Sequence, residues 1–295
     1  MKKVNKYVPD IIVPGFPKSG TSSLFDCMVQ HTKIFGQKKE PHIYSIPDRY
    51  FRRFDPSYDR SFINIFREKP KDSLCIEAST TYLISKQALE LAYYDNPGLK
   101  IIILARDPIE RIISHYNWLR KLGIAKKIFR EEIKDWLGKD FDPNMHFRGN
   151  YKYYVNFSLY GEQLKRCFSI FCKDQILLVS AEEFKSDPHS VISRIFKFLS
   201  IHDIKINTIY SNVTGREFVV KKYPKMPRPL SAVLPSSVKG FFKPFFEEKY
   251  QYYKPSKDEM KWLFSLLEAD FLMLKNEINF IPEQWHLTRE IASLC

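Results

Sequence analysis

A short loop near the N-terminus has the residue types that bind a phosphate. Its sequence is Pro17-Lys18-Ser19-Gly20-Thr21-Ser22-Ser23. Lys18 supplies a full positive charge, and four residues supply hydroxyl donors: Ser19, Thr21, Ser22 and Ser23. An apolar run at 11–13 predicts a strand before the loop, and the residues after Gly20 have helical spacing. Because backbone N–H groups at a helix start point toward a bound anion, the sequence predicts a phosphate site here.

The loop differs from the loop that binds nucleoside triphosphates. Gly15 and Gly20 have the G-x-x-x-x-G spacing, but Thr21-Ser22 stands where Lys and Ser/Thr are expected. The lysine lies inside the loop instead, at Lys18. Triphosphate sites use the later lysine on the outer phosphates, so the pattern argues against ATP. A nucleoside or sugar kinase with this type of loop is the alternative, and Asp107 would then be its magnesium-binding residue at a strand end.

A second motif follows an apolar run at 101–105. It reads Arg106-Asp107-Pro108, and Ser114 comes eight residues after the arginine. Pro108 suits the first turn of a helix, where its missing N–H costs nothing. Together the two motifs resemble the sulfotransferases that use 3′-phosphoadenosine 5′-phosphosulfate (PAPS) and release adenosine 3′,5′-bisphosphate (PAP). The resemblance implies that the first loop holds the 5′-phosphosulfate, and that Arg106 and Ser114 hold the 3′-phosphate.

The catalytic candidates lie in Lys38-Lys39-Glu40-Pro41-His42-Ile43-Tyr44. Sulfuryl transfer to a hydroxyl requires a base for the acceptor proton and a cation for the leaving phosphate oxygen. Glu40 is the candidate base and Lys18 the candidate cation. His42, two residues on, falls on the same side of an extended segment, where it orients the acceptor or is itself the base. The segment resembles the Glu-x-His-aromatic segment of the heparan-sulfate-type branch, which implies that Glu40 is the base.

The next strand-to-loop segment, Glu77-Ala78-Ser79-Thr80-Thr81-Tyr82, departs from that branch. Glycosaminoglycan sulfotransferases carry a lysine where this chain has Ala78, and the segment resembles the bacterial-type branch instead. We expect a hydroxyl or amine acceptor and favour a glycan or glycolipid, with small metabolites and carrier-tethered intermediates left open.

The net charge and the motifs absent from the sequence indicate which kinds of ligand and partner to expect. The chain has 47 basic and 34 acidic residues, a formal net charge of +13, which favours anionic ligands such as PAPS. No zinc spacing or RNA-binding motif is found, so nucleic acid is not expected as a partner, and no metal is expected. Contact with a membrane surface and the oligomeric state stay open.

Cysteines and apolar runs bear on the compartment. Five cysteines form no C-x-x-C pair, which favours reduced, buried thiols: Cys27, Cys75, Cys167, Cys172 and Cys295. No apolar stretch reaches the roughly 18 residues that span a bilayer, and residues 1–7 have no apolar core of a signal peptide. A cytoplasmic location is therefore predicted.

The pattern of short apolar runs between helical segments predicts an α/β fold: a parallel sheet of the P-loop type flanked by helices. We expect one domain over 1–295, with a core at about 8–205, a loop-rich part at 206–255 and a C-terminal helix at about 256–278. Strands are predicted near 10–15, 73–77, 100–105 and 175–180. Helices are predicted near 21–31, 86–94, 108–121, 158–171, 188–199 and 257–277.

Two further segments carry expectations. Residues 122–157 are polar, aromatic and irregular, and predict a lid or acceptor-side insertion. The 211–255 part contains the run Phe241 to Phe246 and is predicted to form loops that either recognise a partner or link to the last helix. Its basic candidates for nucleotide contact are Arg216, Lys221 and Lys222.

Overall fold

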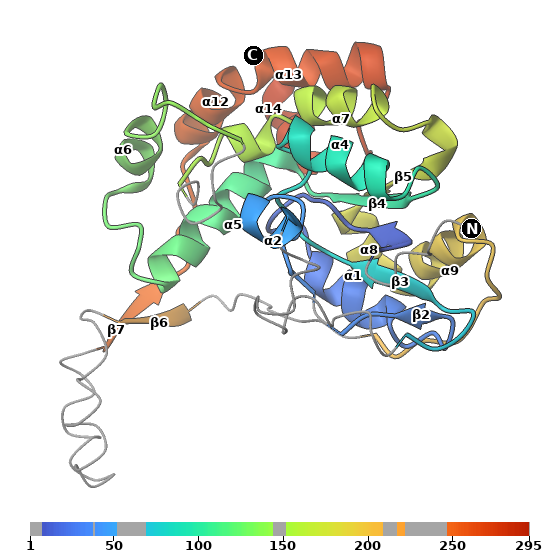
Figure 1. The fold of residues 1–295 in the computed structure, drawn as a ribbon. Helices are drawn as coiled ribbons and strands as arrows, with labels where there is room; N and C mark the ends of the chain where they lie inside the picture. Colours follow the sequence, from blue (N-terminus) through green and yellow to red (C-terminus); the bar gives the residue numbers. More distant parts are fainter. Residues whose placement is uncertain are drawn as a thin grey trace, which may run out of the picture.

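The computed structural model describes residues 8–37, 39–51, 69–143, 152–208, 217–221 and 247–294. Its centre is a five-stranded sheet with the order β2-β3-β1-β4-β5, and all four neighbouring pairs are parallel (Figure 1). The strands are β1 (Ile11–Ile12), β2 (Ile34–Phe35), β3 (Leu74–Glu77), β4 (Lys100–Ala105) and β5 (Ile176–Ser180). The predicted α/β class is confirmed. The strand β2 was not predicted, because two residues give no periodicity.

Strand β4 shows why the sheet is covered on both faces. Ile101 and Ile103 belong to one apolar core, whereas Ile102 and Leu104 belong to the other, and all four are fully buried. Successive side chains of a strand point to opposite faces, so each face needs its own layer of helices. Helices α4 and α7 cover the first face, and α1, α8 and α9 cover the second (Figure 1).

In the first part of the chain, the helices predicted near 21–31, 86–94, 108–121, 158–171 and 188–199 are found close to those bounds, whereas the described helices at 47–51, 129–134 and 181–186 were not predicted. The helices of this part are α1 (Thr21–Met28), α2 (Pro47–Phe51), α4 (Lys86–Asp95), α5 (Pro108–Lys121), α6 (Phe129–Lys134), α7 (Tyr160–Phe168), α8 (Ala181–Ser186) and α9 (Pro188–Phe198). The C-terminal part holds α12 (Lys257–Ser265), α13 (Glu268–Met273), a π-helical turn (Leu274–Ile278) and α14 (His286–Ala292). Single 3-10 turns occur at Asn156–Ser158 and Lys173–Gln175.

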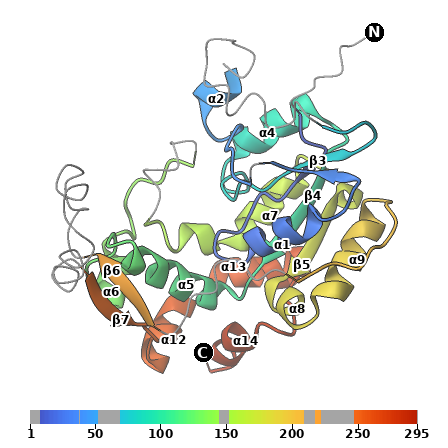
Figure 2. The ribbon, with the colours of Figure 1, turned by 90° about the horizontal axis from the view of Figure 1, so that it is seen from below.

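Three expectations need correction. The predicted helix over 257–277 is interrupted after Ser265 and continues as α13 and a π-helical turn. Residues 122–157 are not irregular throughout, because they contain α6. The loop-rich 206–255 part contains the antiparallel strands β6 (Glu217–Lys221) and β7 (Glu247–Gln251), which lie beside α5 (Figure 2). The run Phe241 to Phe246, with Arg216 and Lys222, lies outside the described residues.

Three cysteines are buried free thiols, as predicted: Cys27, Cys75 and Cys167. Burial raises the pKa of Cys75 and Cys167 to about 12. Cys172 is a free thiol but is exposed, so the prediction of a buried thiol is wrong for this residue. It lies in the turn after α7 and not on a helix face or strand that packs against the core. None of the helices in the described ranges combines the length and apolarity of a membrane span.

Candidate active site

The predicted site residues follow strands that end at one edge of the sheet. The first loop follows β1, Arg106 follows β4, and Glu40 lies beyond β2. Because β1 lies between β3 and β4, the chain crosses from one side of β1 to the other after β3. In parallel α/β sheets, ligands bind in the crevice at the carboxyl ends of strands where the strand order reverses. This edge is therefore the candidate site.

The first loop is shaped for close approach of an anion to its backbone. Lys18 (φ 71°) and Gly20 (φ 92°) have left-handed conformations, and the Phe16 N–H donates to the Leu104 carbonyl of β4 at 3.1 Å. Gly20 is the N-cap of α1, and the first turn of that helix contains no acidic residue. The first-turn amides of a helix have no intrahelical partners, so α1 offers donors and partial positive charge at its start.

Lys18 is surrounded by other cations. Burial is the main cause that lowers the pKa of Lys18 to about 8, and the charges of Arg106 and Lys39 add to it. Arg111 and Lys121 contribute further positive charge. Lys18 Nζ also lies 5.0 Å from the centroid of the Trp118 ring on α5. Such an excess of positive charge favours a ligand that carries several negative charges.

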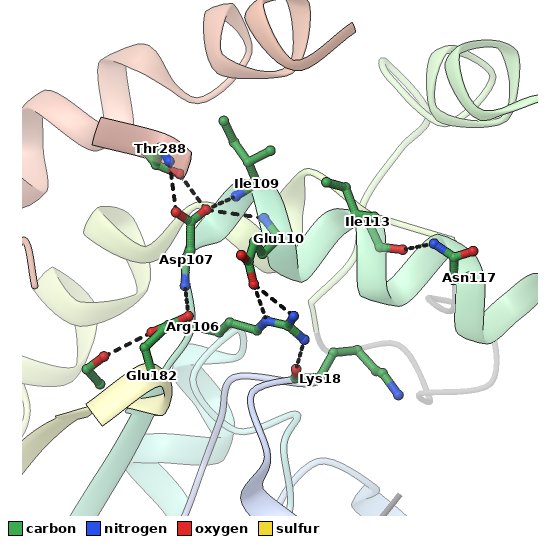
Figure 3. Close-up of polar contacts among 10 residues, drawn as sticks. Lys18, Arg106, Asp107, Ile109, Glu110, Ile113, Asn117, Glu182 and Thr288 are labelled. Carbon is green, nitrogen blue, oxygen red and sulfur yellow. Dashed lines mark hydrogen bonds and ion pairs between the residues drawn. The ribbon is translucent and has the colours of Figure 1, made fainter. Parts of the chain in front are cut away.

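Arg106 connects the loop to α5. Its guanidinium donates to Glu110 Oε2 from Nη2 at 2.9 Å and from Nε at 3.3 Å, and it donates to the Lys18 carbonyl oxygen at 3.4 Å (Figure 3). Burial by itself lowers the pKa of Arg106, but the charge and hydrogen bonds of the Glu110 carboxylate raise it by more. The net effect is a raised pKa. The guanidinium is thus a fixed positive charge beside the loop.

Asp107 anchors the start of α5. Its carboxylate accepts hydrogen bonds from the amides of Ile109 and Glu110, and from both the amide (2.8 Å) and the hydroxyl (2.6 Å) of Thr288 on α14 (Figure 3). The Asp107 amide donates to Glu182 on α8 at 2.9 Å. Burial raises the pKa of Asp107 to about 6, so the group is ionised at neutral pH. A residue in this structural position is not available as a magnesium ligand for the kinase alternative.

Ser114 is buried on α5, and Tyr252 is the residue that the sequence reasoning missed beside it. The Tyr252 hydroxyl faces the side chains of Asn117 and Ser114, and the charges of Arg106 and Glu110 act on it. Asn117 fixes this approach, because its side chain accepts from the Tyr253 amide at 2.8 Å and donates to the Tyr253 carbonyl at 3.0 Å. Tyr252 follows β7, and no motif in the sequence marks it.

Arg111 was also missed. It is fully buried and donates to the Ser158 hydroxyl and the Tyr154 carbonyl. Within the described ranges no carboxylate forms an ion pair with it, and burial lowers its pKa to about 10. Arg111 therefore links the turn at Ser158 to α5 through a hydrogen bond. Its charge also adds to the positive potential at Lys18. Its position among the isoleucines of α5 was the available signal.

Glu40 and His42 lie side by side. Glu40 Oε1 is 2.8 Å from Lys39 Nζ, and Glu40 Oε2 is 3.9 Å from His42 Nε2. Glu40 is 38% exposed, so a solvent-borne acceptor can reach it. The backbone differs from the extended segment that was expected, because His42 has φ 53°. Lys39 joins this group to the loop, since it pairs with Glu40 and its charge acts on Lys18. Lys38 lies outside the described residues.

Hydroxyl groups after β3 hold the segment with Glu40 and His42. The Ser79 hydroxyl accepts from the His42 amide at 2.9 Å, and the Tyr82 hydroxyl accepts from the Tyr44 amide at 3.3 Å. Thr81 Oγ1 lies 3.0 Å from His42 Nδ1 and 2.7 Å from the Ser45 hydroxyl. The sequence predicts no role for these hydroxyls, because serine and threonine in a loop carry no specific spacing signal.

The arrangement can bind a polyanion and remove a proton beside it. Lys18, Arg106 and the start of α1 supply positive charge and donors, and Glu40 is a carboxylate linked to this group through Lys39, which pairs with Glu40 and whose charge acts on Lys18. In the part of the chain that the structure describes, no group of three or more His, Cys, Asp or Glu side chains is placed to hold a metal.

Residues 8–250 match the family described as the Sulfotransferase domain. Heparan sulfate glucosamine 3-O-sulfotransferase 5 of Mus musculus is 25% identical over 213 residues, which cover 70% of this chain and 58% of that enzyme. Heparan sulfate glucosamine 3-O-sulfotransferase 6 of Mus musculus is 23% identical over 261 residues, which cover 82% of this chain and 71% of that enzyme. The chain thus spans little more than half the length of the first relative.

Among solved structures, a sulfotransferase from Alicyclobacillus acidocaldarius aligns with a TM-score of 0.66 and 22% identity. The alignment covers 94% of this chain and 98% of that one. At this identity the likeness shows a shared fold.

Proposed function

Because the chain belongs to the sulfotransferase domain family, we propose that it transfers the sulfuryl group of PAPS to a hydroxyl or amine acceptor. We choose PAPS as the donor because a group of cations surrounds Lys18 at the start of α1. PAPS has phosphate groups at two ends of one nucleoside, and this chain offers two matching places: the Lys18 loop, and Arg106 with Ser114. The kinase alternative is not favoured, since the family match is to sulfotransferases and Asp107 is used in structural bonds.

In the proposed reaction, the acceptor oxygen forms a bond to sulfur while the bond from sulfur to the 5′-phosphate oxygen breaks. Glu40 takes the acceptor proton, and Lys18 neutralises the charge that develops on the leaving oxygen. His42 orients the acceptor or the carboxylate, and its contact with Thr81 holds the imidazole in place. The products are a sulfated acceptor and PAP. The alternative assignment, with His42 as the base, is tested below.

We propose a glycan or glycolipid as the acceptor. Support comes from two relatives that are named as heparan sulfate sulfotransferases, although Ala78 departs from the glycosaminoglycan pattern. The loop between α5 and α6 exposes Leu122, Ile124 and Ile128 among lysines, which suits an acceptor held at a membrane surface. Mass spectrometry of the products from PAPS and a panel of hydroxyl acceptors identifies the class. The cytoplasmic location stays a prediction.

Binding of PAP is the first test of the donor. At a PAP concentration of about 100 times Kd, the free energy of unfolding should rise by roughly 2.7 kcal/mol without magnesium. ADP lacks the 3′-phosphate that Arg106 and Ser114 would hold, so it should stabilise the protein much less. Thermal-shift measurements with PAP, ADP and ATP-magnesium make the comparison. A preference for ATP-magnesium would remove the sulfotransferase assignment and restore the kinase.

The pH dependence of PAP binding tests Lys18. The pKa of Lys18 is about 8 in the free protein, and a bound polyanion favours the charged form and raises that pKa. Binding therefore takes up a proton above pH 8, and the Kd for PAP should rise by up to about tenfold per pH unit there. Calorimetry between pH 7 and 9.5 measures this, above the phosphate pKa of about 6. Lys18→Met is the control and should show a flat profile; a flat profile in the wild type would contradict the role.

A further inference from the structure

The segment 120–128, which joins α5 to α6, exposes a group of aliphatic side chains. Leu122 is 50% exposed, Ile124 37% and Ile128 66%. Eight large apolar side chains are exposed in the part of the chain that the structure describes, and three of them fall within these seven positions. Single exposed apolar residues are ordinary, whereas a group of them marks an interaction surface. The 120–128 segment is therefore a candidate for binding a partner.

Backbone hydrogen bonds hold this segment in place. Gly123 (φ 72°) ends α5, and the amides of Gly123 and Ile124 each donate at 2.9 Å to carbonyls in the last turn of that helix. This pair of bonds is the Schellman arrangement. The Lys127 carbonyl accepts from the Tyr116 hydroxyl at 2.9 Å, and the Lys127 amide donates to Glu132 at 3.2 Å. Because the segment is already ordered, little conformational entropy is lost when a partner binds it.

Cations accompany the aliphatic side chains. The segment contains Arg120, Lys121, Lys126 and Lys127 and no acidic residue, and its three lysines are exposed. Lys127 also pairs with Asp135 on the C-terminal side of α6, at 2.6 Å. Aliphatic side chains among lysines are typical of a segment that lies at the surface of an anionic bilayer. The aliphatic groups enter the boundary of the acyl chains, and the lysines contact the headgroup phosphates.

The position of the segment connects it to the candidate active site. Helix α5 extends away from the sheet, and the 120–128 segment lies at its outer end (Figure 1). One turn earlier on that helix, the Trp118 ring lies 5.0 Å from Lys18 Nζ, and the Trp118 carbonyl accepts from the Leu122 amide at 3.1 Å. A surface bound by Leu122 is thus about one helical turn from the residue that contacts Lys18.

We propose that the 120–128 segment docks the protein on an anionic lipid bilayer, with its three aliphatic side chains in the acyl boundary and its lysines at the headgroups. Docking itself does not depend on the reaction; only its use, to bring a lipid-linked acceptor to Lys18, rests on the proposed function. A second copy of the chain fits less well, because a two-fold contact would bring the same lysines face to face. A soluble polyanion would leave the aliphatic side chains in water.

Sedimentation with lipid vesicles tests the docking. The wild type should bind vesicles of equal parts phosphatidylcholine and phosphatidylglycerol, and should bind phosphatidylcholine alone much more weakly. Leu122→Ser/Ile128→Ser should bind the anionic vesicles at least about tenfold more weakly, because apolar burial is lost while the charge is unchanged. Lys126→Gln should bind about fivefold more weakly. The matched controls are Leu272→Ser (Leu272 is 48% exposed, on α13) and Lys275→Gln, also exposed, which should stay within twofold of the wild type.

Two further measurements identify what binds the segment. Addition of the anionic vesicles should slow amide hydrogen exchange across residues 122–128 and leave exchange in α13 unchanged. Light scattering in solution gives the mass of the free protein. A wild-type dimer that Leu122→Ser/Ile128→Ser dissociates would assign the segment to a second copy of the chain and overturn the proposal.

The other outcomes are equally definite. A wild type that does not bind anionic vesicles, or a Leu122→Ser/Ile128→Ser variant that binds them as the wild type does, would overturn the docking. Weaker binding by Lys126→Gln alone would show adsorption by charge without insertion, which also overturns it. The Kd for PAP should be unchanged in every variant, so failed docking leaves the sulfotransferase proposal intact. A wild type that docks but does not bind PAP would overturn the proposed function and keep the docking.

Discussion

Replacement of Glu40 by glutamine should lower kcat by about 10²–10⁴-fold, the usual contribution of a positioned base. Glutamine keeps the size and much of the hydrogen bonding to Lys39, but it cannot take the acceptor proton. The Kd for PAP should barely change, because Glu40 lies outside both phosphate-binding motifs. Steady-state kinetics at saturating PAPS, together with calorimetry of PAP binding, measure the two quantities separately.

His42→Ala distinguishes the two assignments of the base. If His42 only orients the acceptor, this variant should be milder than Glu40→Gln. A nearly inactive His42→Ala with an active Glu40→Gln would move the base to His42. Glu183→Gln is the matched control, since Glu183 is also ion-paired, to Arg194 at 2.7 Å, and partly exposed. Near-normal activity in both test variants would mean that the base lies elsewhere.

Lys18→Ala should reduce kcat by about 10²–10³-fold, the effect of removing one positioned group that stabilises developing charge. It should also weaken PAP binding, because the proposed mechanism places Lys18 on the phosphate before and after transfer. Arg106→Ala should differ: a charge-assisted contact is worth about 1.5–3 kcal/mol, so the Kd for PAP should rise about 10- to 100-fold with a smaller change in kcat.

Measured together, the two variants separate a role in PAP binding from a role in catalysis. Arg194→Ala is the control, because Arg194 forms a two-pronged pair with Glu183 much as Arg106 pairs with Glu110. An Arg106→Ala variant with a PAP affinity within twofold of the wild type would remove its 3′-phosphate role. A Lys18→Ala variant with normal kcat at saturating PAPS would limit Lys18 to binding.

Local features of the site were predictable because they depend on neighbours in the sequence. The strand–loop–helix around Lys18 follows from an apolar run, glycine and a helical pattern. Pro108 begins α5 as predicted, since a proline in the first turn acts within a few residues, and the structure adds Asp107 as the side-chain cap. The helix predicted near 188–199 is α9, which has the same kind of start, with Asp187 as the side-chain cap and Pro188 in the first turn. The parallel sheet followed from short buried runs separated by helices.

The contacts that complete the site join residues distant in sequence, and only the tertiary structure places them. Tyr252 comes to Ser114 because Asn117 binds the backbone after β7. The two-residue strand β2 carries no periodicity, yet its pairing with β3 brings the Glu40 segment to the hydroxyls of Ser79 and Tyr82. The sequence alone determined which residues have the charges, donors and carboxylates that phosphate binding and proton removal require. Strand order decided which buried groups support them, because hydrogen bonds between separate loops depend on packing and leave no spacing in the chain.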